Sequence, residues 1–180
     1  MTDAMRRPAR SEAPEYYFRY IDQVSDGDIL HCLTRQREDV LRELRNVPEI
    51  LAGHRYADGK WTLREVSGHV NDCERLFCAR AFWFARGFDS PLPSFDQNVA
   101  IAAGRFDERS WSGLIDEFAA VRDATLTFFS SLPAGAWDRG GIASDNPFTV
   151  RALAYIAAGH VTHHLAIVRS RYLSNPPAVC

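Results

Sequence analysis

Apolar residues recur every three to four positions in four long segments of the chain, the spacing typical of amphipathic helices. These segments cover about residues 25–47, 62–86, 107–131 and 149–173. The second has the clearest start, because Thr62 and Glu65 have the spacing of a capping box, and Gly87 follows its last apolar residue. Four helices with comparable apolar stripes predict an all-α protein, a four-helix bundle.

The segments between these helices contain several prolines and glycines and show no convincing strand pattern. The longest runs from Phe88 to Phe106, a stretch that can extend at most about 60 to 70 Å. Each helix would be only about 33 to 38 Å long at 1.5 Å per residue. The segment is therefore long enough to cross the bundle and join parallel second and third helices, although its length does not require that path.

A single domain accounts for most of the 180 residues, because the 46% hydrophobic content is enough for one buried core. We expect the bundle to occupy residues 25–173. Residues 1–24 would form an N-terminal extension that is partly flexible, and residues 174–180 a short C-terminal tail.

Composition excludes several classes of function. The 21 basic and 23 acidic residues give a net charge of −2, so no positive field is available to bind nucleic acid. The four cysteines form no C-x-x-C pair, which argues against a disulfide scaffold or a thiolate zinc site and suits a reducing compartment. The N-terminus lacks a secretory signal, and no stretch approaches the roughly 18 apolar residues of a membrane span. We expect a soluble cytoplasmic protein whose partners include neither nucleic acid nor membrane.

Two histidines in the fourth helix are the strongest sign of chemistry. His160 and His164 are one helical turn apart on the predicted core stripe, so their imidazoles leave the same face. Burying two imidazoles side by side is costly unless something bridges them, and a divalent metal at about 2.0 to 2.1 Å from each nitrogen would do so. Such pairs also occur on solvated faces, so the spacing alone leaves both interpretations open.

A third ligand is available in the second helix, where His69 borders the apolar stripe. The alternative for His69 is a hydrogen-bonded residue at the boundary of the core. Three imidazoles from facing helices would leave one coordination position open, the arrangement of a catalytic metal site. Because Val161 stands where the H-E-x-x-H motif places its glutamate, the mechanism of the zinc proteases is excluded.

Polar residues near these histidines have two interpretations each. Asp72 either orients an imidazole and acts as a base or is a solvated carboxylate. Cys73 is either a ligand or nucleophile or a core residue. His163 lies about 60° around the helix from His160, which favours a flanking position over a fourth ligand.

Charged residues that follow in the second helix, Glu74, Arg75 and Arg80, are interpreted as surface or interface charges. An arginine near the metal would nevertheless suit an anionic substrate. Loops at residues 95–97 and 138–148 could line the mouth of the pocket and select the substrate.

Several motifs are specific in combination, although each alone is weak. They are Gly59-Lys60-Trp61-Thr62-Leu63-Arg64-Glu65, Gly68-His69 with Asp72 and Glu74, Pro91-Leu92-Pro93-Ser94-Phe95-Asp96, and Gly159-His160 with His163-His164-Leu165. At these residues the sequence resembles the DinB-like family of small bacterial four-helix proteins, named for DNA-damage induction. The resemblance covers about residues 26–173.

This resemblance implies an up-down-down-up bundle with a long crossover between helices 2 and 3, often assembled as a homodimer. It also implies one divalent metal per chain, held by His69, His160 and His164. Zinc and nickel are the favoured metals, with iron, manganese and copper as alternatives. Characterised relatives include thiol-dependent transferases and isomerases, in which a low-molecular-weight thiol such as bacillithiol or mycothiol binds the open metal position as a thiolate.

Three hypotheses of function follow. The first is a metal-dependent enzyme acting on a small molecule, either a thiol-dependent S-transferase or isomerase or a hydrolase that uses metal-bound water. The second is a noncatalytic stress-response protein that binds a metal or ligand or dimerises through a helical face, which would explain the lack of a convincing second catalytic group. The third is a plain bundle with structural histidines that binds no metal.

Overall fold

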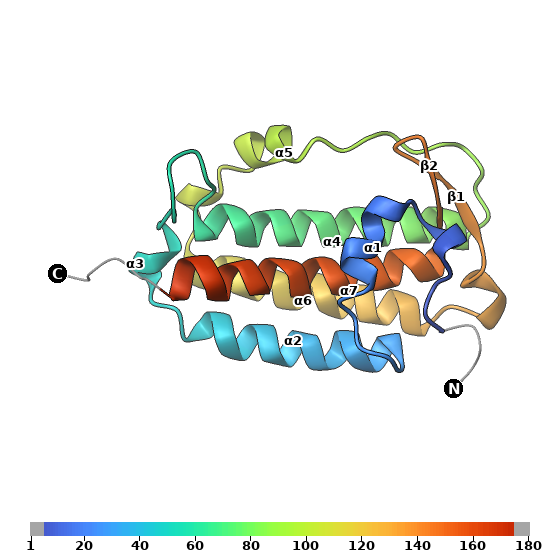
Figure 1. Cartoon of the computed structure of the whole chain (residues 1–180), viewed down its shortest axis with the longest axis horizontal. Helices are drawn as coiled ribbons and strands as arrows, with labels where there is room; N and C mark the ends of the chain where they lie inside the picture. Colours follow the sequence, from blue (N-terminus) through green and yellow to red (C-terminus); the bar gives the residue numbers. More distant parts are fainter. Residues whose placement is uncertain (1–5, 175–180) are drawn as a thin grey trace.

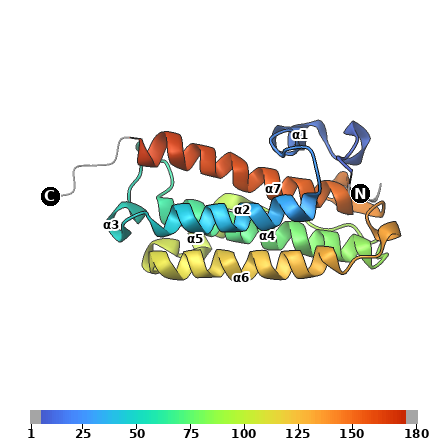
Figure 2. The same ribbon diagram turned by 90° about the horizontal axis from the view of Figure 1, so that it is seen from below.

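Four long helices form the body of the computed structural model, which describes residues 6–174 (Figure 1). They are α2 (Ile29–Arg45), α4 (Leu63–Ala85), α6 (Trp111–Ser130) and α7 (Val150–Ile167), the last continued by a π-helical segment at Val168–Leu173. Helices α2 and α7 run in one direction, and α4 and α6 run in the other (Figures 1 and 2). Both α2 and α4 pack against α6 and α7. The predicted up-down-down-up four-helix bundle is therefore confirmed.

The helix starts follow capping residues in the sequence. Thr62 and Glu65 form the predicted capping box, in which the Glu65 amide donates to Thr62 Oγ1 at 3.0 Å and the Thr62 amide donates to Glu65 Oε2 at 2.7 Å. The side chain of Thr149 caps α7 by accepting a hydrogen bond from the Ala152 amide. These two caps fix the helical phase of the segments that carry the candidate histidines.

Two helices start later than the apolar pattern predicts. Helix α2 starts after the Asp28 cap, because Gly27 before it has a φ of 137° and cannot continue a helix. Helix α6 starts after the Ser110 cap, because Phe106–Glu108 forms a separate 3-10 turn. The periodicity thus located both helices but not their first residues.

A β-hairpin connects α6 to α7, where the sequence pattern predicted no strand. After a 3-10 turn (Ala134–Ala136), β1 (Gly140–Ala143) pairs antiparallel with β2 (Asn146–Thr149). Ser144 and Asp145 between them have φ of 51° and 59°, the left-handed conformation of a two-residue hairpin turn. The expectation of connections without strands was therefore wrong here, because four-residue strands are too short to show an alternating pattern.

The long connection between α4 and α6 returns along the outside of α4 (Figure 1). It carries α5 (Gln97–Gly104), which packs on α4, and it contacts the hairpin at Leu92. The Leu92 amide donates to the Ile142 carbonyl at 2.9 Å, and the Ser144 amide donates to the Leu92 carbonyl at 3.1 Å. The predicted crossover is thus confirmed. Another short helix, α3 (Glu49–Ala52), lies between α2 and α4.

The N-terminal segment lies across α7 (Figure 2). A 3-10 turn (Arg10–Glu12) leads into α1 (Glu15–Ile21), in which Phe18 and Tyr20 are buried. A Cβ atom on Gly159 would lie 2.1 Å from the Tyr20 carbonyl oxygen, so the approach of α1 to α7 requires glycine at this position. The division of the chain at residues 24 and 173 stays a prediction, and most of the expected C-terminal tail lies outside the described residues.

The apolar faces of these elements form two clusters along the bundle. One joins α1, the hairpin and the start of α7 around Trp137, Phe148 and Leu153. The other joins α2, α4 and α6 around Trp111 and Phe118. Among residues 6–174, no helix is both long and apolar enough to cross a lipid bilayer.

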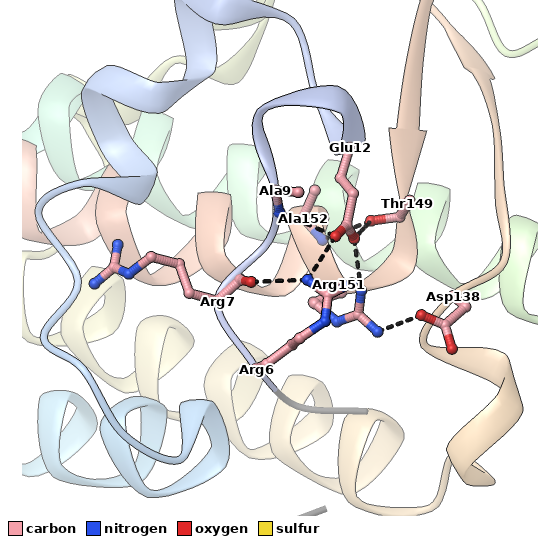
Figure 3. Close-up of polar contacts among 8 residues, drawn as sticks. All are labelled: Arg6, Arg7, Ala9, Glu12, Asp138, Thr149, Arg151 and Ala152. Carbon is pink, nitrogen blue, oxygen red and sulfur yellow. Dashed lines mark hydrogen bonds and ion pairs between the residues drawn. The ribbon is translucent and has the colours of Figure 1, made fainter. Parts of the chain in front are cut away.

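Glu12 attaches the N-terminal segment to the start of α7 (Figure 3). Its Oε1 accepts a hydrogen bond from the Ala9 amide at 3.0 Å, and its Oε2 accepts from Thr149 Oγ1 at 2.9 Å and from Arg151 Nη1 at 2.7 Å. The buried Arg151 also pairs with Asp138. Burial by itself raises the pKa of Glu12, but these hydrogen bonds and the charge of Arg151 hold that pKa below its ordinary value. Glu12 therefore holds the N-terminal segment on α7 as a charged carboxylate.

Glu12→Gln is expected to loosen this segment and to lower the free energy of unfolding by about 2 kcal/mol, a typical loss for hydrogen bonds to a charged group. Trypsin should then cleave after Arg10 faster than in the wild-type protein, as measured by mass spectrometry of the released peptide. Glu15→Gln is the matched control, because Glu15 is exposed and its ion pair with Arg10 lies at the surface. Equal cleavage rates in wild type and Glu12→Gln would contradict this role.

Two charges of α4 that the sequence interpretation placed at the surface are buried. Glu74 is 1% exposed and Arg80 is 3% exposed. Glu74 accepts two hydrogen bonds from Arg122 of α6, at 2.6 and 2.8 Å. The surface assignment was therefore wrong for both residues, because their polar partners lie on other segments of the chain. Arg75 is exposed, as expected.

Candidate metal centre

The packing of α4 against α7 brings three histidines together between the two core clusters. His69 lies in the second turn of α4, on the face that contacts α7. His160 and His164 lie one turn apart on α7. These are the three residues that the sequence identified as candidate ligands, and the structure places all of them at one point.

One ring nitrogen from each of His69, His160 and His164 lies within 4.8 Å of the other two. The Nε2 atoms of His69 and His160 are 3.2 Å apart, a distance that also suits a hydrogen bond between two neutral rings. Two nitrogens bound to one tetrahedral ion at 2.0 to 2.1 Å would be about 3.3 Å apart. The donor set and its spacing therefore fit a single divalent metal ion.

Burial favours the neutral form of all three rings. His69 and His160 are each 4% exposed. Burial lowers the pKa of His69 to about 4 and is the main cause that lowers the pKa of His164 to about 3. The pKa of His160 lies well below its ordinary value, first because of burial and then because of the neighbouring histidines. A histidine must be neutral to bind a metal, so the rings present suitable nitrogens at neutral pH.

Aromatic side chains enclose the histidine cluster. The ring of Trp61 lies 4.9 Å from that of His69, and the rings of Tyr20 and Phe77 lie 5.3 and 5.6 Å from that of His160, measured between centroids. Such rings exclude water and lower the local dielectric constant, which strengthens electrostatic interactions at the cluster.

A family model described as the DinB superfamily matches residues 33–168 of the chain. The chain belongs to the DinB superfamily. The matched residues include both histidine-bearing helices, α4 and α7, but not α1. The resemblance predicted from the sequence motifs is therefore confirmed.

Two solved structures have a similar fold. YfiT from Bacillus subtilis, described as a probable metal-dependent hydrolase with an unusual four-helix bundle topology, is 15% identical, with a TM-score of 0.73 over 96% of this chain and 98% of that chain. A mycothiol-dependent maleylpyruvate isomerase is also 15% identical, with a TM-score of 0.64 over 76% of this chain and 58% of that chain. At this identity the likeness shows the fold alone. A comparison with curated proteins found no match.

Three further candidates lie near the cluster of this DinB protein without joining it. The Oδ1 atom of Asp72 lies 3.4 Å from Nη1 of Arg75, and Asp72 is not part of the converging group of ligand atoms. The Sγ atom of Cys73 contacts the His69 ring, at 3.6 Å from Nδ1 and 3.7 Å from Nε2, but Cys73 is not one of the residues whose ligand atoms converge. Burial raises the pKa of this thiol to about 12. His163 is partly buried, with its ring against α1.

A pocket of about 220 Å³ opens onto the cluster. His69 and His160 line it, together with residues of α1, the crossover and the hairpin turn. Phe95 and Ser144 are among them, so the loops expected at residues 95–97 and 138–148 do contribute to the pocket. A second pocket, of about 280 Å³, is lined in part by His164. The cluster is therefore buried but accessible to small molecules.

The sequence interpretation missed two parts of this pocket. Helix α1 contributes Tyr16, Tyr17 and Tyr20, whose helical spacing was a usable signal in a segment interpreted as an extension. Helix α4 contributes Arg80, which the sequence interpretation favoured as a surface or interface charge while keeping open an arginine near the metal; its position three helical turns after His69 on the same stripe was the available signal.

Proposed function

We propose that His69, His160 and His164 bind one divalent transition metal and that the protein is a metal-dependent enzyme acting on a small molecule. The observation that carries this proposal is the convergence of three imidazole nitrogens at an open pocket. Zinc and nickel are the metals that we favour for an all-imidazole site, with iron, manganese and copper as alternatives.

Two reactions suit such a site. A bound divalent ion supplies Lewis acidity, which lowers the pKa of a thiol or a water molecule and makes it nucleophilic at neutral pH. The chain would supply three ligands, which leaves one coordination position open for the thiol or water. The rings of Tyr20 and Phe77 exclude bulk water from the site. YfiT, a probable hydrolase, supports the use of water, and the mycothiol-dependent isomerase supports the use of a thiol.

We favour thiol-dependent S-transfer or isomerisation over hydrolysis. Within the described residues, the histidine cluster includes no carboxylate that could take a proton from water. A thiol loses its proton far more readily than water, so it depends less on such a base. The low-molecular-weight thiol would come from solution.

Purified protein is expected to contain about one divalent ion per chain by elemental analysis. Removing the ion with a chelator should lower the Tm, and adding it back should restore the Tm, because a ligand that binds only the folded state stabilises that state. Protein that neither contains nor takes up a metal would contradict the proposal and favour a plain bundle.

The reaction is tested by incubating metal-loaded and metal-free protein with a panel of thiols, including mycothiol and bacillithiol, and electrophilic substrates. A parallel incubation with activated esters and no thiol tests for hydrolysis. We expect turnover that requires both the metal and a thiol. Turnover of esters alone would assign the protein as a hydrolase, and full metal occupancy without turnover would favour a noncatalytic binding protein. The homodimer, the cytoplasmic location and the role in a stress response stay predictions.

A further inference from the structure

Arg80 is a buried arginine in the pocket beside the histidine cluster. Its Nη2 donates hydrogen bonds to the Pro93 carbonyl at 3.0 Å and to Ser144 Oγ at 2.8 Å. The Tyr17 hydroxyl is a third neighbour: burial raises its pKa, and the charge of Arg80 and a hydrogen bond with Arg80 oppose that rise. All three neighbours are neutral, and Pro93, Ser144 and Tyr17 together take up only part of the five N–H donors of the guanidinium group. The group therefore keeps N–H donors for another acceptor.

The other buried arginines within residues 6–174 have carboxylate partners. Arg122 pairs with Glu74, and Arg151 pairs with Glu12. No ion pair among the described residues includes Arg80. A guanidinium group stays charged when buried, and a buried charge without a counter-ion is costly. An anionic ligand would supply the counter-ion that the chain does not.

Arg80 lies on the face of α4 that also carries His69, Cys73 and Phe77. Eleven residues separate Arg80 from His69, about 16 Å of helix rise and close to three full turns. Helical side chains lean toward the N-terminus of their helix, so Arg80 leans toward His69. A molecule that binds Arg80 at one end can therefore present its other end to the histidine cluster.

The rest of the pocket is largely aromatic. Its rings come from α1, α4 and the crossover and belong to Tyr16, Tyr17, Tyr20, Phe77 and Phe95. Rings of this kind pack in offset or edge-to-face geometry on other aromatic groups. The volume of about 220 Å³ lies below the range of roughly 300 to 1,000 Å³ that is usual for drug-sized ligands, so the occupant is small.

We propose that Arg80 binds the carboxylate of a small aromatic acid whose opposite end lies at the histidine cluster. This assignment of a substrate class rests on the proposed function. A carboxylate carries the single negative charge that one guanidinium group can balance, and it accepts two parallel hydrogen bonds from that group. Ser144 and the Pro93 carbonyl hold the guanidinium group in place. Arg80 therefore selects the substrate at a distance from the metal ligands.

Isothermal titration calorimetry tests this with 3-phenylpropionate, 4-phenylbutyrate and their neutral carboxamides, on zinc-loaded and on metal-free protein. Wild-type protein is expected to bind at least one acid about tenfold or more tightly than its amide in both forms. Arg80→Gln should weaken binding of that acid about 10- to 100-fold, the range for hydrogen bonds to a charged group, and leave binding of the amide unchanged. Arg80→Lys should recover part of the affinity, because lysine keeps the positive charge but lacks the planar guanidinium group that donates two parallel hydrogen bonds.

Arg75→Gln is the matched control, because it removes the same charge from an exposed position on α4 that does not line this pocket. It should bind the acid as the wild type does. Circular dichroism and the Tm of each variant establish that it is folded, and if Arg80→Gln is not, Arg80→Lys provides the comparison.

Equal affinity of wild type and the Arg80 variants for the acid overturns the proposal, as does equal affinity of wild type for acid and amide. Binding that disappears with the metal and does not depend on Arg80 would mean that the acid binds zinc, which also overturns it. Arg80-dependent binding to metal-free protein, combined with no metal-dependent turnover, would reject the proposed enzymatic function and leave the acid-binding site standing.

Discussion

Replacing His160 by alanine is expected to abolish stoichiometric metal binding. His160 is central in the cluster, with its Nε2 3.2 Å from that of His69 and its ring centroid 4.5 Å from that of His164. Substituting residues that only orient a metal ligand costs about 10- to 100-fold in affinity, so loss of a ligand should cost more. Elemental analysis after dialysis measures the metal content per chain, and competition with a chelator measures the affinity.

His163→Ala is the matched control for this experiment. His163 is in the same turn of α7, but its ring lies against Tyr20 and outside the cluster. This variant is expected to retain about one ion per chain. Full metal content in His160→Ala would contradict the site, whereas equal loss in both variants would contradict the placement of His163 outside it.

The candidate site could be predicted because its candidate ligands lie on two strongly marked helices. The spacing of His160 and His164 sets their relative position as soon as the segment is helical. The capping box at Thr62 fixes the phase of α4, which turns His69 toward the core. Spacing within a helix does not show which turns of α4 and α7 meet, and the resemblance to the DinB-like family supplied that pairing.

The missed features depend on contacts between segments that are distant in the sequence. The apolar pattern of α6 favours Val121 and Phe128 as core residues, yet both are only partly buried, whereas Arg122 and Thr125 are buried. A charged residue is rarely buried without a partner, and the partner of Arg122, Glu74, is 48 positions away. The periodicity of one helix carries no information about such a pair. Helix α1 was missed for a similar reason, since seven residues become a stable helix only by packing on α7.

Arg122 and Gln36 link all four long helices through hydrogen bonds. Its Nε and Nη2 donate to the carboxylate of Glu74 on α4 at 2.6 and 2.8 Å. Its Nη1 donates to the Leu33 carbonyl at 3.0 Å and to Gln36 Oε1 at 2.8 Å, both on α2. Gln36 in turn donates to the Ala158 carbonyl of α7 at 2.8 Å. The network thus connects the two helices that carry the histidines.

Arg122→Met is expected to lower the free energy of unfolding by about 3 to 5 kcal/mol, because it leaves the Glu74 carboxylate buried without a partner. In a protein of this size, such a loss corresponds to a fall in Tm of about 6 to 20 °C. Denaturant unfolding of metal-free protein, followed by circular dichroism, measures the change. Asp123→Asn is the matched control, because Asp123 is the next residue and its ion pair with Arg37 lies at the surface, where we expect a loss below about 1 kcal/mol.

Glu74→Leu alone should also be destabilising, since it leaves the Arg122 guanidinium group buried with neutral acceptors only. The double variant should lose less stability than the sum of the single losses, with a coupling of about 1 to 3 kcal/mol, because no unpaired charge is then buried. Additive losses would contradict the buried pair. If the double variant is as stable as the wild type but binds metal more weakly, the network serves chiefly to hold α4 and α7 at the spacing that the three histidines require.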